Sequence, residues 1–203
     1  MSRTGGEKTR KKIFTAAERL FAEKGYDGTG IQDIALNAGI NKALIYYHFK
    51  NKQDIIDSLF RATLDEMFSM QGDAESKIRA ATGDAYIQER LSSIINYLDK
   101  KRKILKVMLM ESLKETAKGH LSLFQCANMV IEKNINEVMT ALKSTNKRIN
   151  RNELLIHEFF TGFLPIVFFA IFKDKWAEFF KCGKEETLKL FLKVFKESHI
   201  RFG

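Results

Sequence analysis

The sequence predicts an all-α protein, with a small N-terminal helical domain followed by a larger helical domain. Apolar residues recur at helical spacing along most of the 203-residue chain. A single proline and 12 glycines argue against a loop-rich β fold. A chain of this length can bury a substantial core, and we expect two domains rather than one compact unit.

The charge balance favours an anionic partner. The formal net charge is +9 and the pI is near 9.5, which suits nucleic acid and a membrane surface equally well. The two cysteines, Cys126 and Cys182, form no CxxC pair, as expected for a reduced cytoplasmic protein. The polar N-terminus does not resemble a signal peptide.

The N-terminal segment, residues 1–12, is rich in lysine and arginine, and we expect it to begin as a flexible basic arm. It is either a solvated terminus or a contact for phosphate or the minor groove. The helix that follows ends near Gly25, and a turn over residues 26–30 comes next. The apolar face of that helix consists of Ile13, Ala16, Ala17, Leu20 and Phe21.

Residues 31–52 predict two short helices joined by a tight turn. In the first helix Ile34, Ala35 and Ala38 lie at helical spacing, and Gly39 supplies the left-handed backbone that ends it. Two helices joined by a turn that contains glycine are typical of the helix-turn-helix motif.

The second of these helices is expected over residues 42–49, with Asn41 as its N-cap. Ile40, Ile45 and Phe49 fall on one face and can pack against the first helix. A helix of about 8 residues is about 12 Å long, which suits a major groove about 12 Å wide. This stretch therefore predicts DNA binding.

Lys42 and Lys52 occupy the first positions of two helices, where the helix dipole disfavours a cation by roughly 0.3–1 kcal/mol. A phosphate docked at these helix starts would reverse that sign. Exposed lysines also tolerate so small a penalty, which is the simpler explanation for either lysine alone. Both together, beside Tyr46, Tyr47 and His48, favour DNA.

A connecting helix is expected to begin at Lys52, capped by Asn51 with Asp54 three residues further on. It fades before Gly72, and residues 71–83 carry the boundary to the larger domain. We therefore divide the chain into a helix-turn-helix domain over residues 1–51, a connecting helix over residues 52–70, and a ligand-binding and dimerisation domain over residues 71–203.

The C-terminal domain contains a nearly apolar stretch over residues 159–172. It has about 14 residues where a membrane span needs about 20, so we expect a buried core helix, kinked or split at Pro165. The last helix, residues 184–200, is apolar on two sides and needs two packing partners, its own core and a second subunit. The residues assigned to dimerisation are Leu188, Phe191, Leu192 and Phe195, while Leu190 and Val194 point elsewhere.

Aromatic, sulfur-containing and rarer polar residues of this domain predict a pocket for an apolar or aromatic small molecule. Taken singly, each is also ordinary core filling at helical spacing, so the prediction depends on the group. The candidate ligand-binding residues are Met108, Cys126, Met129, His157, Phe160, Phe163, Phe168 and Trp176.

The sequence contains no grouping that predicts an enzyme. Its four histidines and two distant cysteines show no metal-ligand spacing, and there is no Ser-His-Asp grouping or phosphate loop. His120 and Cys126 lie six positions apart, which does not place them on one helical face. We expect no catalytic site, no metal and no cofactor.

Residues 13–56 resemble the tetracycline-repressor (TetR) family of bacterial transcription regulators. The resemblance covers the LFAEKGY helix end, the IQDIA helix, the Gly39 turn and the segment KALIYYHFKNK. It implies an all-α homodimer in which three N-terminal helices bind DNA. It also implies that a variable C-terminal domain holds a ligand and dimerises through its last two long helices.

The resemblance also implies roles for individual residues. Gly30 stands where the family often has threonine or serine, which removes a phosphate donor, and Leu44 cannot hydrogen-bond a base. The implied DNA-binding set is Gln32, Asn41, Lys42, Ala43 and Leu44 at the groove, Tyr46, Tyr47 and His48 at the backbone, and Lys52 on a phosphate.

These observations predict a repressor that binds a palindromic double-stranded operator as a homodimer and is released by a small effector, with no membrane partner. The alternative is a basic helical protein that acts at a membrane surface or as an adaptor. That alternative predicts no preference for a DNA sequence.

Overall fold

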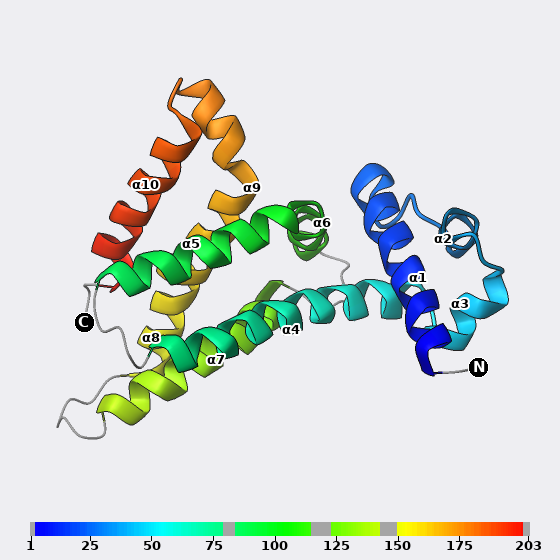
Figure 1. The fold of residues 1–203 in the computed structure, drawn as a ribbon, viewed down its shortest axis with the longest axis horizontal. Coiled ribbons are helices and arrows are strands. Elements are labelled where there is room, and N and C mark those ends of the chain that lie inside the picture. Colours follow the sequence, from blue (N-terminus) through cyan, green and yellow to red (C-terminus); the bar gives the residue numbers. More distant parts are fainter. Residues whose placement is uncertain (1–2, 79–83, 115–122, 143–149, 201–203) are drawn as a thin grey trace. The chain divides into compact units, whose positions relative to one another are not determined.

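The computed structural model describes residues 3–78, 84–114, 123–142 and 150–200, and within these ranges its regular structure is helical, with no strand (Figure 1). The predicted all-α class is confirmed. The chain forms two compact units. The first consists of Met1–Glu66 with Lys103–Leu123, and the second of Met67–Arg102 with Phe124–Gly203.

The first unit contains the helix-turn-helix segment. Its elements are α1 (Arg3–Lys24), α2 (Ile31–Ala38), α3 (Lys42–His48), the start of α4 (Lys52–Ile78) and nearly all of α6 (Arg102–Ser112). Large apolar side chains from successive helices are almost completely buried there, among them Ile13, Phe21, Ile34, Ile45, Phe49, Ile55 and Ile56. This core holds α2 and α3 in place.

α1 begins at Arg3, so the expected flexible basic arm is wrong for the residues from there onward. Lysine, arginine and glutamate are good helix formers, and they outweigh the cost of Gly5 and Gly6. The hydroxyl of Thr9 donates to the carbonyl of Gly5 at 3.0 Å, within the first turns. The basic residues of this segment therefore have fixed positions on a helix.

The predicted turn and helix starts are confirmed. Gly39 has a φ of 64° and ends α2 in the left-handed region. The side chain of Asn41 accepts from the Leu44 amide at 3.0 Å, and that of Asn51 accepts from the Asp54 amide at 2.8 Å. These caps satisfy backbone donors that would otherwise lack partners, so α3 and α4 both have defined beginnings.

The second unit contains the remaining helices. They are α5 (Asp84–Lys100), α7 (Leu123–Leu142), α8 (Arg151–His157), the π-helical turn η1 (Glu158–Phe163), α9 (Leu164–Phe179), α10 (Lys184–Phe195) and the π-helical turn η2 (Lys196–Ile200). Leu91 and Ile95 of α5 form one core cluster with Leu192 and Phe195 of α10. Ile131 and Ile135 of α7 belong to a second cluster, against which Leu155 packs.

Pro165 lies at the start of α9, directly after η1. Because proline has no amide hydrogen, the usual hydrogen bond to residue 161 cannot form. The backbone changes from α to π geometry over the residues before the proline and then returns to α. The expected interruption at Pro165 is therefore present as a π-helical turn within a continuous helical stretch.

α8, η1 and α9 together form one helical stretch, Arg151–Phe179, that is long and apolar enough to cross a membrane. Only 22% of its most apolar window is buried, so the expected buried core helix is wrong. The apolar composition of this stretch predicts that its apolar side chains pack against something, but it does not identify the packing partner. The exposed large side chains of this stretch and of the residue that follows it are Ile156, Phe160, Phe168, Phe172, Trp176, Phe179 and Phe180.

Two histidines meet where η1 packs against η2. Their rings, those of His157 and His199, stack with centroids 4.6 Å apart, and Nδ1 of His199 lies 2.8 Å from the hydroxyl of Thr161. A Cβ atom at Gly162 would lie 2.7 Å from the His199 ring, so glycine makes room for the imidazole. Glu158 lies 3.9 Å from Nε2 of His199.

Acidification is expected to destabilise the second unit through His199. Burial lowers the pKa of its imidazole, a shift that Glu158 opposes and His157 increases. The folded pKa of His199 lies below the unfolded value of about 6.5, so the folded state favours the neutral imidazole. The stability that neutral His199 contributes is present above about pH 6.5 and is lost as the pH falls through the folded pKa. Thermal unfolding of the wild type and His199→Asn at several pH values tests this, and an equal decline in both proteins would contradict it.

Candidate nucleic-acid interface

α2 and α3 expose most of the residues predicted to meet DNA. Ile45 on the inner face of α3 is fully buried, while Tyr46 and Tyr47 on the outer side have exposed fractions of 51% and 72%. The exposed members of the predicted set also include Gln32, Asn41, Lys42 and Ala43. The short helix α3 therefore presents one polar and aromatic face outward.

Three predicted residues are only partly exposed. Leu44 and His48 lie between the buried and exposed faces of α3, and Lys52 is half-buried at the start of α4. The apolar side chain of Leu44 cannot hydrogen-bond a base. Its partial burial keeps part of this side chain away from water.

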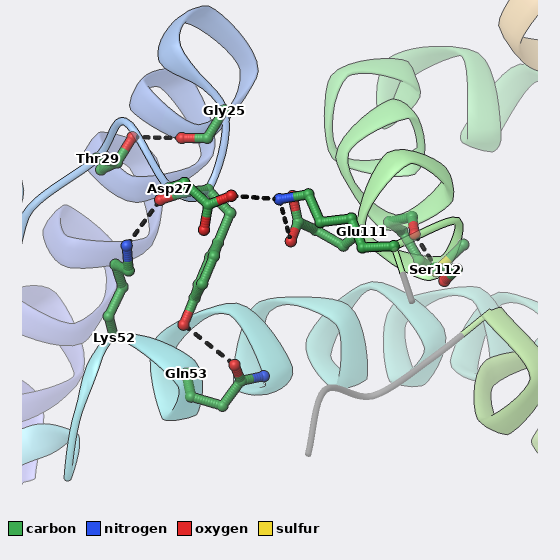
Figure 2. A network of polar contacts seen from close by, with 10 residues as sticks. Gly25, Asp27, Thr29, Lys52, Gln53, Glu111 and Ser112 are labelled. Carbon is green, nitrogen blue, oxygen red and sulfur yellow. Dashed lines mark hydrogen bonds and ion pairs between the residues drawn. The ribbon is translucent and has the colours of Figure 1, made fainter. Parts of the chain in front are cut away.

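Lys52 is held by the turn between α1 and α2. Its Nζ donates to the carbonyl oxygen of Tyr26 at 2.8 Å and lies 4.1 Å from the centre of the Tyr26 ring (Figure 2). The Tyr26 hydroxyl in turn donates to Oε1 of Gln53 at 3.1 Å. An ammonium group has three N–H donors, so the bond to Tyr26 leaves capacity for a phosphate. These contacts orient the Lys52 side chain and leave N–H groups of its ammonium available.

The next residue of this turn, Asp27, is paired with the end of α6. Nζ of Lys114 lies 2.6 Å from Asp27 and 2.8 Å from Glu111, and these carboxylates raise its pKa through side-chain hydrogen bonds (Figure 2). Asp27 is 79% exposed, whereas the side chain of Glu111 is only 6% exposed. Lys114 therefore neutralises a buried carboxylate and joins α6 to the segment that precedes α2.

This cluster was not predicted from the sequence. Glu111 and Lys114 are three positions apart on a polar helix edge, a spacing that is usual for a solvated pair. Asp27 lies 87 positions from Lys114, and sequence spacing carries no information about that contact. The one local hint is that Asp27 belongs to a turn that directly precedes the predicted motif.

The structure distributes the predicted ligand-binding residues over several surroundings. Met108 and Cys126 are buried, on α6 and α7 respectively. Phe160 and Phe163 both contact the ring of Phe159, and His157 stacks on His199. The more exposed members are Met129 at 42%, Phe160 at 60%, Phe168 at 41% and Trp176 at 45%. The pocket that these eight residues were expected to form stays a prediction.

The residues predicted to dimerise are packed within the chain itself. Leu192 and Phe195 are buried in the core cluster with α5, and Leu188 and Phe191 pack against that cluster. Phe191 also stacks on Phe169 of α9 at 3.8 Å. Leu190 and Val194 form the exposed apolar edge of α10, with exposed fractions of 47% and 60%. The four residues assigned to dimerisation thus pack within this chain, and their role in a dimer stays a prediction.

Comparison with known proteins places the N-terminal segment in a family. Residues 13–59 match the family model for bacterial regulatory proteins of the tetR family. This N-terminal segment is similar to the tetR family. The matched residues run from α1 through the turn, α2 and α3 into the first part of α4, which is the segment that carries the interface described above.

Proteins similar to this chain include negative transcriptional regulators of a biofilm operon. The HTH-type regulator IcaR of the icaADBC operon from Staphylococcus aureus (strain Newman) is 46% identical over 54 residues, which is 27% of this chain and 29% of the relative. IcaR from Staphylococcus epidermidis is 43% identical over 58 residues, 29% of each chain. The match thus spans less than a third of these relatives' length.

Solved structures resemble the whole chain. The fatty acid degradation regulator FadR from Bacillus halodurans has a TM-score of 0.62 at 19% identity, covering 92% of this chain and 94% of that one. A TetR-family regulator from Syntrophomonas wolfei has a TM-score of 0.65 at 19% identity and covers 97% of each. FadR from Bacillus subtilis, solved with stearoyl-CoA, has a TM-score of 0.59 at 21% identity and covers 93% and 96%. At these identities the likeness concerns the fold.

Proposed function

We propose that this chain is a tetR-family repressor that binds a palindromic operator as a homodimer and is released by a small apolar effector. The observation that carries the proposal is the outer face of α3, where Lys42, Ala43, Tyr46 and Tyr47 are exposed on a helix with a satisfied N-cap. A short helix held by a core on one side and free on the other suits insertion into a major groove.

Dimerisation is proposed to use the exposed edge of α10 together with aromatic residues of α9. Leu190 and Val194 lie one helical turn apart on α10, and both are exposed. Phe168, Phe172 and Trp176 of α9 repeat at the same spacing and are each more than 40% exposed. A two-fold symmetric interface built on these side chains would bury apolar surface that is exposed to water in a single chain.

The effector is proposed to be apolar because the second unit is rich in aromatic side chains that are only partly covered. Release requires that the effector binds the DNA-incompetent conformation more tightly, with a coupling of about 1–3 kcal/mol. Since a FadR of similar fold was solved with stearoyl-CoA, acyl-CoA thioesters are a suitable first panel. Absence of both a thermal shift and operator release across acyl-CoA and other lipophilic compounds would argue against this part of the proposal.

DNA recognition is tested by titrating the protein with its own upstream region and with random duplex at the same salt concentration. A clear preference for the upstream region is expected, whereas a membrane-surface or adaptor protein would show none.

Substitutions at the two helix starts separate phosphate binding from base reading. Lys52→Ala is expected to lower the magnitude of the salt slope by about 1, because each phosphate contact contributes about 0.9 to it. Lys42→Ala is expected to change the preference among operator variants. Lys24→Ala, at an exposed position at the end of α1, serves as the control and should change neither. Unchanged slope and preference in both interface variants would refute the assigned roles.

A further inference from the structure

Arg10 lies beside the C-terminal end of α3, although it belongs to α1. Its guanidinium carbon is 5.2 Å from the centre of the Phe14 ring and 4.9 Å from that of Phe49. The two rings contact each other with centroids 5.6 Å apart, and Phe49 is the buried residue that ends α3. A guanidinium held over two aromatic rings has a restricted position even though it is exposed.

Within the described part of the chain, nothing accepts a hydrogen bond from this guanidinium. Among the residues that the structure describes, Arg10 has no ion pair and no hydrogen-bond acceptor. Contact with aromatic rings engages the flat face of a guanidinium and leaves its five N–H donors free to point outward. An oriented donor group without an acceptor is therefore present next to the recognition helix.

The surroundings of Arg10 favour an anion as the missing acceptor. Lys8, Lys11 and Lys12 are exposed on the same turns of α1 and add positive potential. His48 lies close by, since a Cβ atom at Gly6 would be 3.7 Å from its ring, and its Nε2 is buried with no partner in the described part of the chain. Tyr47, next to it, is 72% exposed.

We propose that Arg10 binds a DNA phosphate beside the end of α3, so that the DNA interface extends from the helix-turn-helix onto the first turns of α1. This inference rests on the proposed function. The two parallel N–H groups of a guanidinium match two phosphate oxygens, and the Phe14 and Phe49 rings hold them in one orientation before DNA arrives. A phosphate contact positions the protein on the duplex and carries no base preference.

The test compares Arg10→Ala, Arg10→Gln and Arg10→Lys with Arg19→Ala. Arg19 is exposed on the same helix, nine positions further on, which places it on the opposite face. Each variant is titrated against the upstream region and against random duplex over a range of salt concentrations, after circular dichroism has verified its helical content.

Arg10→Ala and Arg10→Gln are expected to bind both duplexes about 10-fold more weakly, with the magnitude of the salt slope reduced by about 1. Arg10→Lys should retain the slope and lose less affinity, because it keeps the charge without the planar fork. Arg19→Ala should behave as the wild type.

Equal slopes for Arg10→Gln and Arg19→Ala would overturn the proposal, and this comparison holds even if Arg10→Ala fails to fold. A loss of binding confined to the upstream region would overturn it as well, because it would indicate base reading. If the wild type prefers no DNA sequence, the proposed function is refuted. If the wild type binds its operator and the Arg10 variants bind with the same affinity and salt slope, only the Arg10 contact is refuted.

Discussion

Val194→Asp is expected to convert the proposed dimer to a monomer and to reduce binding to the proposed operator sharply. Val194 is 60% exposed on α10, next to Leu190 on the same edge. A carboxylate at the centre of an apolar interface loses its hydration without gaining a partner. A central interface residue typically contributes 2 kcal/mol or more, which corresponds to at least about 30-fold in the dimer dissociation constant. Light scattering after gel filtration measures the change directly.

The control for this variant is Lys193→Gln, at the neighbouring exposed position of α10. It makes the same change in net charge without placing a charge on the apolar edge. The monomer is expected to bind a single half-site and to lose the affinity that two linked heads provide. A Val194→Asp protein that remains dimeric at micromolar concentration would place the interface elsewhere, and the exposed aromatic residues of α9 would then need another explanation.

The parts of the fold that sequence reasoning predicted well are those set by local interactions. Gly39, Asn41 and Asn51 each act on backbone groups within a few positions, so their roles follow from residue type and spacing. The family resemblance rests on the same local segment, residues 13–56, and the family model matches residues 13–59.

The orientation of α10 could not be predicted in the same way. Leu192 and Val194 are both apolar, and Leu190 and Val194 add a short apolar edge beside the longer apolar row of the helix. Periodicity indicates that α10 is apolar on two sides, but only the packing of Leu192 against α5 identifies which side belongs to the chain's own core. The sequence alone therefore does not distinguish the core face of α10 from a face for a second subunit.

Lys114→Met is expected to lower the free energy of unfolding of the first unit by about 3 kcal/mol, because it leaves the Glu111 carboxylate buried without a counter-ion. Asp27→Asn should cost less than about 1 kcal/mol, since Asp27 is 79% exposed and its pair is largely solvated. Urea unfolding at neutral pH measures both. At that pH Lys114 is fully protonated and contributes its full stabilisation. Because the pKa of Lys114 is raised in the folded state, this stabilisation is lost only as the pH rises through the folded pKa, above 10.5.

The double variant Glu111→Gln with Lys114→Met separates a missing counter-ion from a missing contact. If the cost of Lys114→Met arises from an uncompensated buried charge, removing that charge as well should restore most of the lost stability. If the double variant is as unstable as the single one, the cost arises from the packing of Lys114 itself.

The contact of Lys114 with Asp27 predicts an effect on DNA binding as well, since freeing the Tyr26 turn from α6 removes one restraint on Lys52. Operator affinity should therefore fall in both the single and the double variant, even where stability is restored.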